Sequence, residues 1–186
     1  PGFDRGMLFQ EGALLPWRTT IKNIEFGLEI KGTNTEEREE IAKKYLRLVG
    51  LEGFENSYPF ELSGGMMQRV ALARVLTFNP SILLMDEPFA SVDALTRESL
   101  QNELLKIWTE MKKTIVFVTH SIDEVIYLSD RIAVMSARPG KVKGVVEITL
   151  PRPREGTRTS AEFARLRDHI WNMLKKEMGS DELQRD

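Results

Sequence analysis

The sequence predicts an α/β fold with a largely parallel sheet. Two short apolar runs, residues 81–85 and 114–118, have the length and composition of buried strands. Helical patterns occupy residues 63–78, before the first run, and residues 93–113, between the two runs. Alternation of strands and helices favours a layered domain, because parallel strands need a crossover segment between them.

The first third of the chain predicts a single helix. Residues 1–30 are expected to be irregular, because glycines and a proline interrupt their short apolar groups. Residues 33–50 have an amphipathic pattern. Thr33 and Glu36 are spaced as a capping box, and Gly50 takes the position after the C-cap.

The middle of the chain predicts a core helix followed by a buried strand. The helix at 93–113 carries apolar side chains at helical spacing, which we assign to the core: Leu100, Leu104, Ile107, Trp108 and Met111. The run at 114–118 is continuous and does not alternate, which predicts burial on both faces.

The last third predicts a short helix, a hairpin and a C-terminal helix. The Ser121-x-x-Glu124 spacing is that of a capping box. Residues 131–136 and 142–150 are expected to pair around an Arg-Pro-Gly-Lys turn. An amphipathic helix then runs from 160 to about 178, is expected to end at Gly179, and is followed by a frayed polar tail.

The composition excludes several classes of protein. The chain has 186 residues, which fit one domain with at most a small appendage. It has no cysteine, which excludes disulfides and thiolate metal sites. Its formal net charge of −2 gives no general attraction to nucleic acid. No apolar run approaches the roughly 20 residues that span a bilayer, and residues 1–5 are typical of neither a signal nor a transit peptide. We therefore expect a cytosolic protein whose membrane association comes through a partner.

Residues 63–69 predict an anion site at a helix N-terminus. Ser63 can cap the helix, and Gly64 and Gly65 leave its first backbone N–H groups unobstructed. These groups lie at the positive end of the helix dipole, where phosphate is favoured.

Two carboxylates follow the strand at 81–85. Asp86 and Glu87 stand where the strand reaches the surface, and Pro88 turns the chain. One carboxylate can serve the ligand shell of Mg²⁺ while the other polarises an attacking water. The alternative is a solvated strand end without chemistry.

Three further polar residues become candidates through their positions. His120 follows the strand at 114–118 and would share the carboxyl edge of a parallel sheet with the acid pair, where ligands collect. Its imidazole could hydrogen-bond a γ-phosphate oxygen. By themselves, Gln10 would be a surface glutamine and Asp93 a helix N-cap.

These residues follow one another in the order Gln10, Ser63-Gly64-Gly65, Asp86-Glu87, Asp93 and His120. The order resembles the Q-loop, signature, Walker B, D-loop and H-loop of ABC transporter ATP-binding subunits, and the resemblance covers nearly the whole chain. Five finer segments are similar to the nitrate, sulfonate and taurine import group: Leu14-Leu15-Pro16-Trp17-Arg18, Met85-Asp86-Glu87-Pro88-Phe89, Asp93-Ala94-Leu95-Thr96-Arg97, Met135-Ser136-Ala137-Arg138-Pro139-Gly140 and Leu150-Pro151-Arg152-Pro153-Arg154.

The resemblance implies an ABC-type P-loop ATPase domain at residues 1–150, with a helical signature subdomain at about 12–80, and a C-terminal linker and helix at 151–186. It implies an enzyme that hydrolyses ATP with Mg²⁺ to energise import of a small anion. The implied partners are a second ATP-binding subunit in a head-to-tail dimer, transmembrane permease subunits and, indirectly, a substrate-binding protein, but no nucleic acid. The implied location is the cytoplasmic face of a bacterial-type plasma membrane.

The resemblance also implies residue roles. Glu87 is the base, Asp86 serves Mg²⁺, and His120 holds the γ-phosphate. Gln10 senses the γ-phosphate and contacts Mg²⁺. A further set would face the nucleotide of the partner chain: Ser63, Gly64, Gly65, Met66 and Asp93.

The chain departs from the family pattern in three places. Met66 replaces the common signature glutamine, and Ser91 and Val92 replace the Ala-Leu pair of the D-loop. No segment matches the Walker A pattern G-x-x-x-x-G-K-[ST], since the only Gly-Lys pair, Gly140-Lys141, belongs to the hairpin turn.

We expect the Walker A segment to precede Pro1, in an N-terminally incomplete sequence, and the chain alone to be inactive. One alternative is a naturally truncated, catalytically degenerate subunit that completes a partner's ATP site or acts as a scaffold. A non-transport ABC ATPase is a weaker alternative, because the stretch from Gln10 to Ser63 has no room for a long coiled coil.

Overall fold

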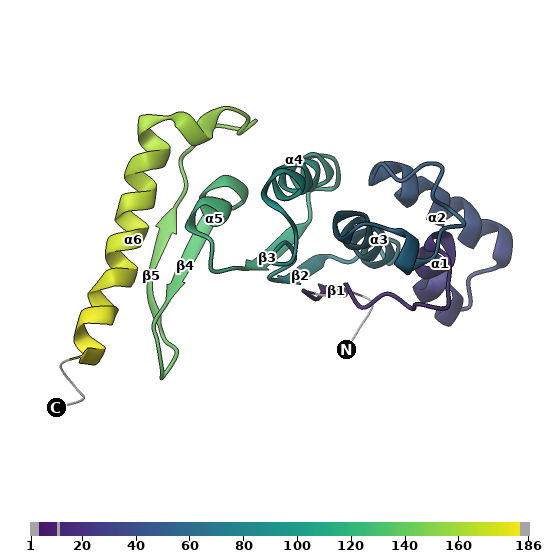
Figure 1. Cartoon of the computed structure of the whole chain (residues 1–186), viewed down its shortest axis with the longest axis horizontal. Coiled ribbons are helices and arrows are strands. Elements are labelled where there is room, and N and C mark those ends of the chain that lie inside the picture. The colour runs from purple at the N-terminus through teal and green to yellow at the C-terminus, as the bar shows by residue number, and fades with distance from the viewer. Residues whose placement is uncertain (1–3, 11, 183–186) are drawn as a thin grey trace. The chain divides into compact units, whose positions relative to one another are not determined.

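The computed structural model describes residues 4–10 and 12–182, and the chain forms two compact units, residues 1–118 and 119–186. The first unit contains, in order, β1 (Arg5–Leu8), α1 (Thr20–Ile30), α2 (Thr35–Leu48), η1 (Pro59–Glu61), α3 (Gly64–Leu76), β2 (Ile82–Asp86), α4 (Ala94–Met111) and β3 (Thr114–Val118) (Figure 1). The second contains α5 (Ile122–Leu128), β4 (Arg131–Met135), β5 (Val142–Glu147), η2 (Thr157–Thr159) and α6 (Ala161–Glu182). The functional boundaries at 12–80, 1–150 and 151–186 stay predictions.

The sheet of the first unit is parallel, in the order β1-β2-β3, which confirms the predicted α/β class. Its register aligns Leu8, Met85 and Phe117 on one face. The same face carries Gly6, where Val75 of α3 occupies the place that a Cβ would take. In Figure 1, α3 and α4 lie on one side of these strands. The core of the unit therefore lies between the sheet and this helical layer.

Among the described residues, those of β3 on the opposite face of the sheet are exposed to solvent. Val116 is 49% exposed and Val118 is 52% exposed, while the alternate residues Ile115 and Phe117 are half-buried. The prediction that residues 114–118 are buried on both faces is therefore wrong. Because the helical layer covers one face, the strand alternates even though its sequence does not.

The expectation that residues 1–30 are irregular is also wrong, since they contain β1 and α1. Their glycines mark close packing. A Cβ at Gly27 in α1 would overlap the ring of Phe78, and a Cβ at Gly6 in β1 would overlap Val75. Glycine thus lets α1 and β1 approach the end of α3.

The helix predicted at 33–50 forms as α2, with a different cap. Asn34 Oδ1 accepts a hydrogen bond from the Glu37 N–H at 3.0 Å, so the predicted Thr33–Glu36 capping box is wrong by one residue. Gly50 has a φ of +63°, as predicted for the residue after the C-cap.

A buried amide fixes the segment that leads into α1. Asn23 Oδ1 accepts from the Leu15 N–H at 2.8 Å, and Nδ2 donates to the carbonyls of Leu15 at 3.1 Å, Arg18 at 2.9 Å and Thr19 at 3.1 Å. The segment nevertheless leaves Trp17 72% exposed.

In the second unit, β4 and β5 form the predicted antiparallel hairpin. The predicted end of the last helix at Gly179 is wrong, because α6 continues to Glu182. A glycine inside a helix costs about 1 kcal/mol relative to alanine but does not by itself end the helix. Residues 183–186, in the predicted frayed tail, lie outside the described residues.

The guanidinium of Arg154 caps the C-terminal end of α5. Its Nη1 donates to the carbonyls of Ile126 at 2.9 Å, Tyr127 at 3.1 Å and Ser129 at 2.6 Å. Burial lowers the pKa of Arg154 to about 10. A buried cation is stabilised here by the carbonyl end of a helix.

Within the described part of the chain, none of the helices combines the length and the apolar character that crossing a bilayer requires.

Candidate functional site

The N-terminus of α3 is capped and open, as predicted. Ser63 Oγ accepts from the Met66 N–H at 3.3 Å. Ser63 and Gly64 are exposed, and a Cβ at Gly64 would meet no described atom within 4 Å. Gly65 is buried, since its Cβ position is occupied by Thr96 Cγ2 of α4. The first glycine therefore keeps the backbone N–H groups accessible to an anion, and the second permits contact with α4.

The two carboxylates stand at the carboxyl end of β2. Asp86 pairs in register with Val118 and is exposed. Glu87 follows in left-handed backbone, with a φ of +44°, and its N–H donates to the Val118 carbonyl at 2.9 Å. A non-glycine residue rarely adopts such a φ outside a turn or a strained functional position. The chain thus turns sharply between strand and loop at the residue predicted to be the base.

A short loop joins this turn to α4. Asp93 Oδ1 accepts from the Thr96 N–H at 3.0 Å and caps the helix. Hydrogen bonds from Thr96 hold the pKa of Asp93 below its ordinary value. Arg97 reaches back over the loop, donating from Nε to the Phe89 carbonyl at 3.2 Å and from Nη2 to the Val92 carbonyl at 2.7 Å. The loop that carries Asp93 is therefore held at both ends.

Gln10 is exposed, and its backbone is attached to α3. Gln68 Nε2 donates to the Gln10 carbonyl at 2.9 Å and also to the carbonyl of Pro88. Arg74, further along the same helix, donates to the carbonyls of Gly12 at 2.7 Å and Ala13 at 2.9 Å.

Sequence analysis missed Gln68, Arg74 and Arg97. Gln68 left one usable signal: it is polar, yet it lies at helical spacing between Gly65 and Leu72, which are both buried. A polar residue on the buried stripe of a helix needs a hydrogen-bond partner, which predicts a structural or positioning role.

The first unit therefore contains Gln10, residues 63–66, Asp86-Glu87 and Asp93, linked through α3 and α4. His120 is exposed and lies at the start of the second unit, two residues after β3. Its predicted role beside the acid pair stays a prediction.

The acid pair fits a nucleotide-bound Mg²⁺ better than a protein-only metal centre. Among the described residues there is no cluster of three or more His, Cys, Asp or Glu that could hold a metal ion. Mg²⁺ in phosphoryl-transfer sites needs only one or two carboxylates, since water and substrate phosphates complete its shell. An exposed Asp86 at the strand end meets that need.

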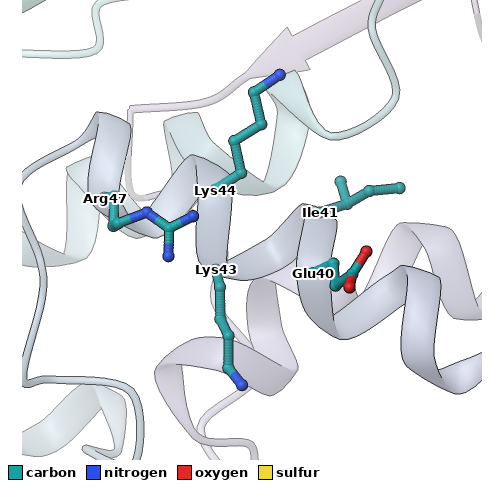
Figure 2. Close-up of a pocket in the computed structure, with 5 residues that line it drawn as sticks. All are labelled: Glu40, Ile41, Lys43, Lys44 and Arg47. Atoms are coloured by element: carbon teal, nitrogen blue, oxygen red, sulfur yellow. The ribbon is translucent and has the colours of Figure 1, made fainter.

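A pocket of about 490 Å³ lies elsewhere, on α2, and is lined by Glu40, Ile41, Lys43, Lys44 and Arg47. Figure 2 shows Lys43 and Lys44 pointing to opposite sides of the helix. Lys43 is paired with Glu39 at 2.7 Å, which raises its pKa. The predicted site residues lie outside this pocket, and its basic groups do not converge on a common point.

The sequence of the chain is similar to those of known proteins. The family model for ABC transporters matches residues 3–90. An uncharacterised ABC transporter ATP-binding protein of Methanocaldococcus jannaschii is 61% identical over 178 residues, which are 96% of this chain and 66% of that protein. The aliphatic sulfonates import ATP-binding protein SsuB of Bacillus cereus is 47% identical over 176 residues, 95% of this chain and 68% of that protein. The chain belongs to the ABC transporter ATP-binding protein family.

The ABC fold is matched in a solved structure as well. A dimeric ATP-binding cassette in a post-hydrolysis state, bound to ADP and Pi, superimposes with a TM-score of 0.66 and 36% identity, over 80% of this chain and 64% of that one. The chain thus spans about two thirds of the length of the ABC proteins that it resembles.

Proposed function

We propose that this chain is the ATP-hydrolysing subunit of an ABC transporter that imports a small anion of the nitrate, sulfonate or taurine type. One observation carries the proposal: a capped, unobstructed helix N-terminus and a strand end with two carboxylates lie in one unit, where the Asp93 loop joins the strand end to α4 and α4 contacts the helix N-terminus at Gly65. Similarity to an aliphatic sulfonates import protein supports the class of substrate.

The proposed roles are those that the family resemblance implies. Mg²⁺-ATP, when bound, supplies the phosphoryl group and the metal charge that neutralises it. Asp86 would hold the metal. Glu87, at the turn that follows, would accept a proton from the attacking water. Gln10 would orient the γ-phosphate and its water, and the family resemblance alone adds His120 to this role.

A second set of residues serves the partner subunit in a head-to-tail dimer: Ser63, Gly64, Gly65, Met66 and Asp93. Gly64 supports this assignment, because the space around its Cβ position is free of described atoms and a foreign phosphate could approach the backbone. The proposed partners are a second ATP-binding subunit, the transmembrane permease subunits and, through them, a substrate-binding protein. The assembly would place the chain at the cytoplasmic face of the membrane.

ATP affinity depends on a Walker A segment, which the printed residues do not contain. Three charge-assisted phosphate contacts at about 1.5 kcal/mol each total about 4.5 kcal/mol, more than a thousandfold in affinity. We therefore propose that residues 1–186 by themselves bind ATP weakly and turn it over negligibly. A second candidate is a subunit that only completes a partner's site. Micromolar ATP binding by the product of the complete gene would rule out that second candidate.

The test uses the product of the complete gene, assembled with its permease. Glu87→Gln should abolish ATP hydrolysis and leave ATP-driven dimer closure intact, because the amide keeps the turn but cannot accept the proton. Glu110→Gln, at an exposed position of α4, is the matched control and should keep full turnover. Turnover retained in the Glu87 variant would refute the proposed role.

A further inference from the structure

The amide of Gln68 joins three segments of the proposed ATPase. We infer that Gln68 is a positioning residue, which ties the helix that serves the partner's nucleotide to the residues that serve the chain's own. The inference rests on the proposed function and adds a route by which the two ATP sites of the dimer influence each other.

From α3, the side chain of Gln68 reaches the two other segments, which contain Gln10 and Pro88. Gln68 lies one turn after Gly65 on α3 and is only 5% exposed. Its Nε2 donates to the carbonyls of Gln10, at 2.9 Å, and of Pro88, the residue after Glu87. A buried amide with two carbonyl partners favours one arrangement of the segments that it joins, because any other leaves polar groups unpaired.

The loop that contains Gln10 and Gly12, here called the Gln10 loop, also lies close to the side-chain oxygen of Gln68. Gly12 has a φ of +65°, and a Cβ there would lie 3.0 Å from Gln68 Oε1 and 3.2 Å from Ala71 Cβ. The loop therefore has little space in which to shift independently of α3.

Arg74 provides an internal comparison. It binds the carbonyls of Gly12 and Ala13 from the same helix, and burial lowers its pKa. Of these two side chains, Gln68 alone also reaches Pro88. Arg74 thus fixes the Gln10 loop, whereas Gln68 fixes that loop and the turn after the acid pair together.

Coupling follows from the shared helix. In the proposed dimer, closure of Gly64 and Gly65 over the partner's nucleotide moves the start of α3. Through Gln68 the movement displaces the Gln10 loop and the turn at Pro88, which belong to the other nucleotide. Occupancy of one site is thereby transmitted to the second.

The positioning role is tested by residue-resolved hydrogen exchange on the purified chain. The reporters are the Gly12 N–H, bound to the Phe9 carbonyl at 3.1 Å, and the Ala90 N–H, bound to the Glu87 carbonyl at 3.2 Å. Gln68→Leu should accelerate exchange at both by about tenfold, since each loop loses a hydrogen bond. Arg74→Met should accelerate Gly12 only.

Unchanged exchange in the Gln68→Leu chain, or acceleration at Gly12 alone, would overturn the inference. If that chain loses protection in β2 and is unfolded, Gln68→Met replaces it. Methionine keeps the length of the side chain and has no donor, so it should also accelerate exchange at both reporters.

The coupling is tested in the assembled ATPase through the dependence of its rate on ATP concentration. Gln68→Leu should lower the Hill coefficient of the assembly toward 1, whereas Arg74→Met should not. An unchanged coefficient would overturn the coupling. Absence of hydrolysis in the unsubstituted assembly would overturn the proposed function and the coupling with it, and the exchange experiment would still decide whether Gln68 positions the loops.

Discussion

The contact between Gly65 and Thr96 makes a quantitative prediction about the start of α3. A methyl group at position 65 would overlap Thr96 Cγ2, while the next neighbours, Thr96 Cβ at 3.8 Å and Val92 Cγ1 at 3.9 Å, lie at ordinary contact distance. Gly65→Ala should therefore strain one methyl contact, and Thr96→Ser should relieve that strain while retaining the hydroxyl.

The magnitude follows from two opposing effects. Overpacking of this kind costs about 1–3 kcal/mol. Alanine in place of glycine in a helix returns up to about 1 kcal/mol. Gly65→Ala should thus lower the free energy of unfolding by about 0–3 kcal/mol, and the coupling energy with Thr96→Ser should be about 1–3 kcal/mol.

Urea unfolding, followed by the fluorescence of Trp108 in α4, measures this cycle. Trp17 is 72% exposed and Trp171 is 54% exposed, so both can be replaced by phenylalanine to leave one reporter in the first unit. Gly64→Ala is the matched control, because its new methyl would meet no described atom and should not destabilise the chain.

Additive effects of Gly65→Ala and Thr96→Ser on stability would refute this prediction. If Gly65→Ala costs the same within about 0.5 kcal/mol in the presence and absence of Thr96→Ser, the two residues do not interact as the structure indicates. A loss in the Gly64 control equal to that at Gly65 would attribute the effect to the backbone and not to Thr96.

Three further predictions concern charged groups. Asp93→Ala should lower the melting temperature at pH 7. Because the pKa of Asp93 is depressed in the folded state, the difference in melting temperature between the two chains should shrink as pH falls below about 3.8. A difference that stays constant with pH would contradict this. Burial, opposed by Arg69, raises the pKa of Glu103, so the stability of the unsubstituted chain relative to Glu103→Gln should decrease as pH rises from 4 to 7; the opposite trend in calorimetry would show that Arg69 outweighs burial. Arg154→Met should destabilise the second unit by about 2–4 kcal/mol, because it removes the guanidinium donor from the carbonyls of Ile126, Tyr127 and Ser129, and Arg154→Lys should be intermediate in chemical denaturation.

The elements that the sequence predicted well are those with local signals. Ser63 and Asp93 cap their helices as expected, because an N-cap depends on residues only three positions away. The strand predicted at 81–85 forms one residue later, at Ile82–Asp86, and the predicted hairpin forms from β4 and β5, although β5 ends at Glu147 and not at residue 150. Family membership could be predicted because the motif order does not depend on tertiary detail.

The elements that were missed depend on distant residues. Gly6 and Gly27 lower the local propensity of β1 and α1, and both glycines are explained by side chains about 50 to 70 positions later, Val75 and Phe78. The alternation of residues 114–118 was hidden for a similar reason, since exposure of a strand is decided by the helices that cover the sheet. Gln68 was overlooked because its two carbonyl partners belong to other segments.

The four hydrogen bonds of Asn23 also have a mechanical consequence. They make the segment from Leu15 to Thr19 and helix α1 one stiff body. Because Gly27 has no Cβ, that body packs closely against Phe78 at the end of α3. A force applied at the exposed Trp17 would therefore rotate α1 as a lever against α3 and would not be absorbed by bending of the loop.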